Sequence, residues 1–379
     1  MPELLDIVGQ DAALVQLQRA AAGGRRPHAL IFVGPEGVGR RTTAVEFARY
    51  LLCESPAERK NAGRLAGLDD GFVLRQGCGA CRSCRSLEAG THADLHVVYK
   101  ELGRYHDDPR VRERKMQALG IEVVRDFLIA PAYRASAGGR GVVFIVREAD
   151  LMSLPAHNAL LKTLEEPPAG VTILLICTNL ADLLPTTRSR CQIVRFAPLP
   201  AEFVAETLAA DGIAPAEARF WSVAAGGSIG RAQRLAAEGL YAFARDLPSR
   251  LAGLDVRDAP GLAETLRKAM DKLAKRFQRR DEDLAATLAN RQAGQIILGL
   301  IATAYRDALS VAAGASQPLA HADQADAIRR IAERLGPTGL ADVLAELARL
   351  EGALWRNVGI RLLWDSIAVA CAAPAAAGA

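Results

Sequence analysis

The chain has 379 residues, 50% of them apolar and 24% charged, a composition typical of a globular protein with two or three domains. Its net charge of +4 is compatible with a polyanionic partner but does not predict one. No stretch approaches the roughly 20 uncharged apolar residues that cross a membrane, and the acidic start lacks the basic segment of a secretion signal. A cytoplasmic protein without membrane contact is therefore expected.

The first half of the chain alternates between short apolar runs and stretches with helical spacing of apolar residues. Helices are predicted over 11–22, 42–52, 121–128 and 153–164, and strands over 29–33, 95–99, 141–146, 171–177 and 192–196. Strands that alternate with helices indicate a parallel sheet between helical layers, so residues 1–197 are expected to form one α/β domain.

The strand pattern ends after Pro198. Residues 198–243 are expected to form a small helical domain, and residues 244–379 a helical bundle rich in alanine, leucine and arginine. Within the bundle, residues 267–282 carry seven basic and three acidic side chains, which favours a solvated or intersubunit face over one that binds DNA. The intervals 54–77 and 100–118 are insertions without a predicted role, and the second is expected to be a solvated loop.

A glycine-rich loop follows the first strand. An apolar run, then Gly34, Gly37 and Gly39, then a helix, predicts a phosphate-binding loop, in which backbone amides hold phosphates. Such a loop continues with a lysine that neutralises the phosphates and a serine or threonine that binds Mg²⁺. Here Arg40 and Arg41 occupy those two positions. A glycine-rich turn in an unrelated α/β fold is the alternative interpretation.

The partner half of such a site is an acidic residue after a second apolar strand. Strand 141–146 runs into Arg147 and Glu148, so the position that would hold Mg²⁺ is again an arginine. Thr42 has a hydroxyl group but lies one residue too far along the loop. Hydrolysis is therefore not expected, whereas nucleotide held by loop amides without Mg²⁺ remains open.

Four of the seven cysteines have the spacing of a structural zinc site. Cys78, Cys81 and Cys84 form two successive CxxC steps, and Cys53 is the candidate fourth ligand. His92 or His96 could supply that ligand instead. A redox function is less favoured because no thioredoxin-like unit surrounds the cysteines, and a structural clip is favoured over contact with DNA.

A basic segment, Thr-Arg-Ser-Arg-Cys over 187–191, separates the last two strands. It is expected at the end of the sheet where ligands and partners bind in α/β folds. An arginine at such an end can reach a phosphate on a neighbouring subunit and stabilise transition-state charge there. Without further context, the same arginine is an ordinary surface residue.

In this order, the loop at 34–39, the cysteines, the block Asn-Ala-Leu-Leu-Lys-Thr-Leu-Glu-Glu-Pro-Pro over 158–168 and Ser-Arg-Cys over 189–191 resemble the AAA+ clamp-loader proteins of bacterial DNA replication. The resemblance is strong over about residues 5–197 and architectural beyond them. That family contains ATP-hydrolysing motor subunits, gamma and tau, and a partner that does not hydrolyse ATP. Arg40, Arg41 and Arg147 make this chain look like the latter.

The resemblance implies an AAA+ P-loop domain with a zinc module at 53–84, then a helical lid and a helical collar for oligomerisation. It implies that Arg190, within the Ser189–Cys191 motif, acts as an arginine finger for ATP on an adjacent subunit. The sensor arginine of the second domain would fall on Gly230. Structural zinc is implied on Cys53, Cys78, Cys81 and Cys84, with ATP and Mg²⁺ not bound productively.

The partners that the resemblance implies are gamma or tau and delta subunits in a hetero-pentamer, the sliding clamp, and primed DNA. Two alternatives stay open from the sequence. One is an ATP-hydrolysing subunit that uses Arg40 in place of lysine and Thr42 for the metal. The other is a zinc-dependent DNA-binding module.

Overall fold

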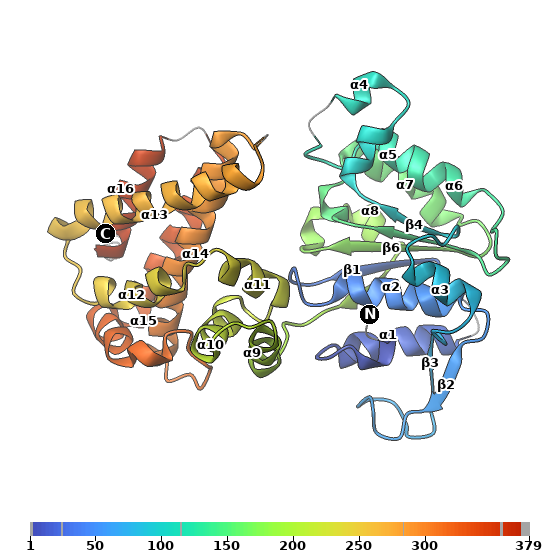
Figure 1. Cartoon of the computed structure of the whole chain (residues 1–379), viewed down its shortest axis with the longest axis horizontal. Coiled ribbons are helices and arrows are strands. Elements are labelled where there is room, and N and C mark those ends of the chain that lie inside the picture. The colour runs from blue at the N-terminus through green and yellow to red at the C-terminus, as the bar shows by residue number, and fades with distance from the viewer. Residues whose placement is uncertain (1–2, 24–25, 114–115, 283, 357–358, 373–379) are drawn as a thin grey trace. The chain divides into compact units, whose positions relative to one another are not determined.

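The computed structural model describes residues 3–23, 26–113, 116–282, 284–356 and 359–372 (Figure 1). The chain divides into two compact units, Met1–Pro200 and Ala201–Ala379. The first unit ends within three residues of the predicted end of the α/β domain. The further boundary expected at residue 243 lies inside the second unit and stays a prediction.

The first unit is built on a five-stranded sheet in which every neighbouring pair is parallel. In spatial order the strands are β4 (Leu95–Val98), β5 (Val142–Val146), β6 (Val171–Cys177), β1 (Ala29–Val33) and β7 (Gln192–Arg195). All residues of β1, β5 and β6 are buried, which explains why their sequences are apolar at every position except Thr172 of β6, whose hydroxyl donates to the carbonyl oxygen of Pro27. The parallel α/β fold predicted from the alternating pattern is confirmed.

Helices cover both faces of this sheet (Figure 1). Helices α1 (Asp11–Ala22) and α2 (Arg40–Leu52) lie on one side, and α5 (Ile121–Val124) and α7 (Leu154–Glu165) lie on the other. Alternate strand residues such as Ile31, Phe144 and Ile173 form one core cluster with side chains of α5 and α7. Ser153 caps α7, because its hydroxyl accepts a hydrogen bond from the amide of Ala156.

Two predicted helices differ from the structure at their ends. Helix α2 begins at Arg40, two residues earlier than expected, because Gly39 adopts a left-handed conformation (φ 98°) that starts the helix directly. The helix expected over 121–128 does not end before Pro131. It continues as a π-helical turn, Arg125–Ile129, and a short α6, Ala130–Ala132, which contains Pro131.

The two insertions contain secondary structure that the sequence did not predict. The cysteine segment holds an antiparallel hairpin, β2 (Ala57–Lys60) with β3 (Val73–Gln76), followed by α3 (Arg82–Glu88). The interval expected to be a solvated loop contains a 3-10 helix, Lys100–Tyr105, and the single-turn α4 (Pro109–Arg112). Asp108 caps α4 by accepting from the amide of Arg110.

The described residues of the second unit form helices and connecting loops without a strand, as expected. Its helices are α9 (Ala201–Ala210), α10 (Pro215–Ala224), α11 (Ile229–Ala237), α12 (Tyr241–Ala252), α13 (Ala259–Arg280), α14 (Ala286–Ala312), α15 (Ala325–Leu354) and α16 (Ile360–Ala372). The buried His321 links α14 to α12. One of its ring nitrogens lies 2.8 Å from Asp307 Oδ2 of α14, and the other lies 3.1 Å from the carbonyl oxygen of Ala244 of α12.

Helix α14 has the length and mean hydropathy of a membrane-crossing helix, and it is the single one among the described residues. Half of that apolar window is buried inside the protein. The buried residues include Ile297, Ile301 and Tyr305, and the Tyr305 hydroxyl donates to the carbonyl oxygen of Cys371 at 2.9 Å. These contacts are those of a core helix in a helical bundle.

Candidate functional site

The glycine loop joins the end of β1 to the start of α2, the context that a phosphate-binding loop requires. Gly34 passes so close to Phe196 that a side-chain carbon at position 34 would lie 2.9 Å from Phe196 Cβ and closer still to its carbonyl oxygen. Gly37 and Gly39 have φ of 74° and 98°, which favour glycine. Steric fit therefore requires glycine at 34, and backbone conformation favours it at 37 and 39.

Arg40, which replaces the loop lysine, points into the protein. Arg40 is 7% exposed, and its Nη1 donates to the carbonyl oxygen of Cys177, the last residue of β6. Burial lowers the pKa of Arg40, whereas the charges of Asp150 and Glu36 raise it. The guanidinium thus satisfies a backbone acceptor of the neighbouring strand.

The next two positions do not rebuild a Mg²⁺ ligand. Arg41 is exposed and Thr42 is half-buried. Thr43 is fully buried, and its hydroxyl donates back to the carbonyl oxygen of Gly39 at 2.9 Å. A hydroxyl group with a local backbone partner is not free to bind a metal ion.

The positions after β5 are held by the segment that follows β4. The Arg147 guanidinium carbon lies 5.4 Å from the centre of the Tyr99 ring, in cation–π geometry. Glu148 has a left-handed backbone (φ 53°), and its carboxylate lies 3.3 Å from Lys100 Nζ. The sequence analysis missed both partners, because nothing in the 100–118 interval predicted its return to the end of β5.

Asp150 provides a further contact between neighbouring strand ends. Its Oδ2 accepts from the amide of Thr178 at 2.7 Å and from the hydroxyl of the same residue. Thr178 directly follows β6, so this carboxylate links the ends of β5 and β6. Asp150, the first carboxylate after Glu148, is therefore occupied by hydrogen bonds from Thr178.

Arg190 lies in the turn between α8 (Pro185–Arg188) and β7. Its guanidinium forms an ion pair with Glu165, donates to the carbonyl oxygen of Thr186 at 2.8 Å and lies 3.2 Å from the Ser189 hydroxyl. The side chain remains 33% exposed, and Glu165 is 48% exposed. Water therefore reaches the pair, and the arginine can exchange its partner.

The turn is anchored from below by a buried contact. His157 of α7 lies 3.3 Å from the hydroxyl of Thr187, and both residues are buried. Burial lowers the pKa of His157. Cys191, the last residue of the motif, is inert as a thiol because burial raises its pKa to about 12.

The sequence analysis placed this turn at the wrong end of the sheet, the end at which the parallel strands finish. Gln192, the first residue of β7, pairs with Leu30 near the start of β1, and β7 ends opposite Val33. Arg190 therefore lies at the amino-terminal end of the sheet, whereas Gly34 follows the carboxyl-terminal end of β1. The error arose because the turn follows β6 in sequence. Before β7 starts, a crossover connection returns the chain to the end of the sheet at which the strands begin.

The four predicted zinc ligands come together. The Sγ atoms of Cys53, Cys78, Cys81 and Cys84 all lie within 4.8 Å of one another, with 3.9 Å between Cys53 and Cys81 and 4.0 Å between Cys78 and Cys84. A tetrahedral Zn²⁺ with bonds of about 2.3 Å needs sulfur atoms about 3.8 Å apart. The cluster therefore fits a structural metal such as zinc.

Amide donors at the cluster favour a thiolate at Cys78, whereas burial raises the pKa of Cys53 and of Cys84. Three amides point at the sulfur atoms of the cluster: Cys78 N at 3.3 Å from Cys53 Sγ, Cys81 N at 3.3 Å from Cys78 Sγ and Cys84 N at 3.4 Å from Cys81 Sγ. Burial raises the pKa of Cys78, but amide donors outweigh it and bring the pKa down to about 7.

Neither candidate histidine belongs to the described cysteine cluster. His92 Nε2 lies 2.8 Å from the Ser83 hydroxyl and its Nδ1 accepts from the amide of Asp94, while His96 stacks on Phe144.

In the second unit, Gly230 lies on α11 where a sensor arginine was expected. Ser228 caps that helix by accepting from the amide of Arg231 at 3.1 Å. A side-chain carbon at Gly299 of α14 would lie 3.5 Å from Arg231 Nη2, so the Arg231 guanidinium reaches toward α14.

Two family models match the chain. The model described as DNA polymerase III, delta subunit, matches residues 9–200, which is just over half of the 379 residues. A second model, described as DNA polymerase III, delta subunit, C terminal, matches residues 262–365.

Individual relatives agree with these models. The chain is 36% identical over 226 residues to DNA polymerase III subunit delta' of Pseudomonas aeruginosa, covering 58% of this chain and 59% of that one. It is 28% identical over 337 residues to subunit delta' of Escherichia coli K12, covering 89% and 86%. Subunit tau of Salmonella typhimurium is 34% identical over 186 residues, or 49% of this chain and 24% of tau.

Proposed function

The chain belongs to the DNA polymerase III delta subunit family, with the delta' type among its relatives, and on this premise we propose that it serves a clamp loader without hydrolysing ATP itself. In this proposal it supplies Arg190 to an ATP molecule bound by a neighbouring subunit. The residues of its own glycine loop then have a structural role.

The observation that carries the proposal is the position of Arg190. It lies at the amino-terminal end of β7, and the glycine loop begins at the carboxyl-terminal end of β1, the adjacent strand. Because β1 is five residues long, the two ends are separated by roughly 15 Å. An arginine at that distance does not serve a phosphate in its own loop, but it suits a phosphate presented by another chain.

The contacts of the chain's own loop support the second half of the proposal. Arg40 is committed to the carbonyl oxygen of Cys177, and Glu148 is paired with Lys100. Arg147 places a cation where Mg²⁺ would need a carboxylate. An ATPase that uses Arg40 and Thr42 instead would require both the inward arginine and this cation to move.

The cysteine cluster has a structural role in this proposal. When bound, a zinc ion would cross-link the end of α2, through Cys53, to the turn before α3, through Cys78 and Cys81, and to α3 itself, through Cys84. Such a cross-link would stabilise the β2–β3 hairpin and α3, because the two strands are only four residues long and bury few side chains.

The partners proposed are those of a clamp loader: gamma or tau and delta subunits in a hetero-pentamer, the sliding clamp and primed DNA, all in the cytoplasm. The test is DNA-stimulated ATP hydrolysis by a loader reconstituted with Arg190→Ala. An arginine finger is worth roughly 10³- to 10⁵-fold in turnover at the site it serves, so the contribution of that one site is expected to disappear while assembly is retained.

Arg188→Ala is the matched control, because Arg188 ends α8 in the same turn and is not the proposed finger. Its loader should keep the turnover of the unmodified complex. If Arg190→Ala leaves turnover unchanged in an assembled loader, the proposed role of Arg190 is wrong.

A further inference from the structure

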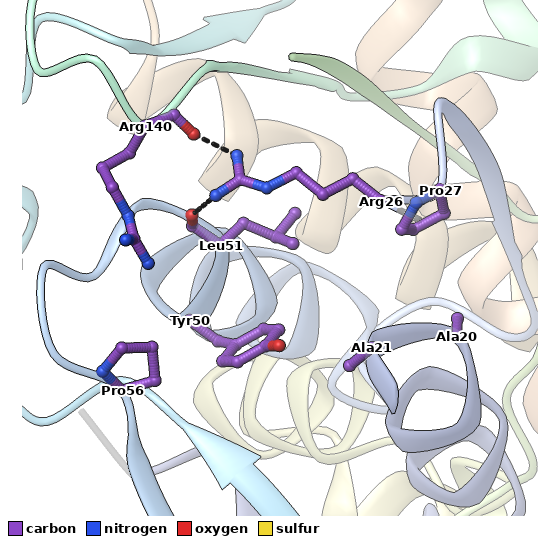
Figure 2. Close-up of a pocket in the computed structure, with 8 residues that line it drawn as sticks. All are labelled: Ala20, Ala21, Arg26, Pro27, Tyr50, Leu51, Pro56 and Arg140. Atoms are coloured by element: carbon purple, nitrogen blue, oxygen red, sulfur yellow. Dashed lines mark hydrogen bonds between the residues drawn. The ribbon is translucent and has the colours of Figure 1, made fainter. Parts of the chain in front are cut away.

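A cavity of about 200 Å³ opens at the amino-terminal end of the sheet in the first unit. It is lined by the last turns of α1 and α2, by Arg26 and Pro27 before β1, by Arg140 before β5, and by Pro56 of the cysteine segment. Figure 2 shows these residues around the opening, with Tyr50 and Leu51 contributed by the end of α2. The glycine loop lies at the opposite end of the strands.

Three side chains that carry hydrogen-bond donors, Arg26, Tyr50 and Arg140, line this cavity. The Arg26 guanidinium is fixed by two backbone carbonyl groups, since it donates to Arg140 and to Leu51 (Figure 2). Two of its five N–H groups are used in this way, which leaves three. The Arg140 side chain is exposed, and in the described part of the chain neither it nor the Tyr50 hydroxyl has a hydrogen-bond partner.

The charges around the cavity are unbalanced. Among the described residues that line it, two carry guanidinium groups and none carries a carboxylate. Burial lowers the pKa of Arg26, and the charge of Arg140 lowers it further, so the two cations are close enough to repel. Glu58, whose charge reaches Tyr50, is already paired with Arg75 at 2.9 Å. The excess positive charge is therefore not compensated by a lining residue.

We propose that this cavity binds a phosphoryl dianion through Arg26, Arg140 and Tyr50. A dianion balances two guanidinium charges, whereas a single carboxylate would leave one cation uncompensated. The planar fork of arginine matches tetrahedral phosphate oxygens, and a tyrosine hydroxyl adds a neutral donor.

The size of the cavity limits the ligand. About 200 Å³ corresponds to roughly six or seven water volumes. This admits phosphate, pyrophosphate or a small phosphorylated sugar. A bound anion would join the Arg140 loop to Tyr50 near the end of α2, three residues before Cys53 of the cysteine cluster, and so stabilise the first unit. The proposal is independent of the role of Arg190.

The test uses the full chain and three probes at constant ionic strength: inorganic phosphate, pyrophosphate and ribose 5-phosphate, against chloride. Binding to the native state should raise the unfolding midpoint by about 2–4 °C for each kcal/mol of stabilisation. Arg140→Gln and Tyr50→Phe should each reduce this shift at least several-fold. A larger shift with ribose 5-phosphate than with phosphate would identify a sugar phosphate, and equal shifts would identify the free anion.

Two controls separate the cavity from other cationic sites. Arg134→Gln removes an exposed arginine of the same unit that does not line the cavity, and Arg41→Gln removes the exposed arginine of the glycine loop. Both variants should keep the full shift. The proposal is overturned if Arg140→Gln and Tyr50→Phe respond like the unmodified chain, if Arg41→Gln alone loses the response, or if chloride produces an equal shift.

Discussion

Arg190 and Glu165 form an ion pair that joins the turn before β7 to the end of α7. Both side chains are substantially exposed, so water competes for each of them. An arginine that serves a phosphate on another chain has to leave this carboxylate first. In the role proposed for Arg190, the pair would oppose engagement of a neighbour's ATP by a small free energy.

Replacing Glu165 with glutamine should weaken that competition. For an exposed pair worth about 0.2–1 kcal/mol, the ATP concentration giving half-maximal hydrolysis in the reconstituted loader should fall by at most about five-fold. The free energy of unfolding of the isolated chain should change by less than about 1 kcal/mol. Glu166→Gln is the control, since Glu166 is the adjacent exposed glutamate. A rise in the half-maximal concentration with Glu165→Gln would contradict this account.

Reversing the substitutions at the degenerate site should create affinity for Mg²⁺-bound ATP. Arg40→Lys, Arg41→Thr and Arg147→Asp together restore a phosphate cation, a hydroxyl ligand and a carboxylate near the metal. Calorimetric titration of the isolated triple variant should detect binding that depends on Mg²⁺. Arg41→Thr alone should not, because the cation at Arg147 remains. Equally tight Mg²⁺-dependent binding by the unmodified chain would show that its loop is competent.

The cysteine cluster should hold about one zinc ion per chain, measured by atomic absorption on the purified protein. Cys78→Ser should lose most of that zinc, since a structural site needs four ligands. Chelation should lower the unfolding midpoint of the unmodified chain, because metal binding contributes to folding free energy. Cys191→Ser, which changes a cysteine outside the cluster, should keep its zinc. Full zinc content in Cys78→Ser would exclude this ligand set.

The buried His157 predicts a pH dependence of stability. Burial lowers its pKa in the folded state, while a histidine in the unfolded chain titrates near 6.5. Below that pH the unfolded state takes up a proton that the folded state refuses, so stability present above pH 6.5 is lost as pH falls toward the folded pKa. The loss is up to about 1.4 kcal/mol for each pH unit between the two pKa values.

His157→Gln should flatten this decline between pH 7 and pH 5 when unfolding is followed with denaturant. The variant should not abolish it, because burial also lowers the pKa of His96. An identical slope in the variant and the unmodified chain would mean that His157 does not titrate in this range.

Local patterns were enough to predict the strands, because each of β1, β5 and β6 is buried on both faces and is therefore apolar at every position but Thr172. They were also enough for the four cysteines, since three ligands lie within seven residues. The hairpin of β2 and β3 escaped prediction because its first strand, Ala57–Lys60, is exposed and carries three charged residues.

The contacts of the site residues could not be predicted in the same way. Glu165 and Arg190 are 25 residues apart, and Lys100 and Glu148 are 48 apart, so no sequence period links them. Only the packing of α7 and of the segment after β4 brings these side chains together. The inward course of Arg40 likewise depends on the carbonyl oxygen of Cys177, which a neighbouring strand supplies.

By itself the sequence determined the alternating fold, three of the four clustered cysteines and the arginines at positions 40, 41 and 147, because these depend on residue type and short spacing. The tertiary structure alone decided that Arg190 and the glycine loop lie at opposite ends of the sheet. The reason is the parallel register: β7 begins beside the start of β1, so the turn before it cannot lie where β1 ends.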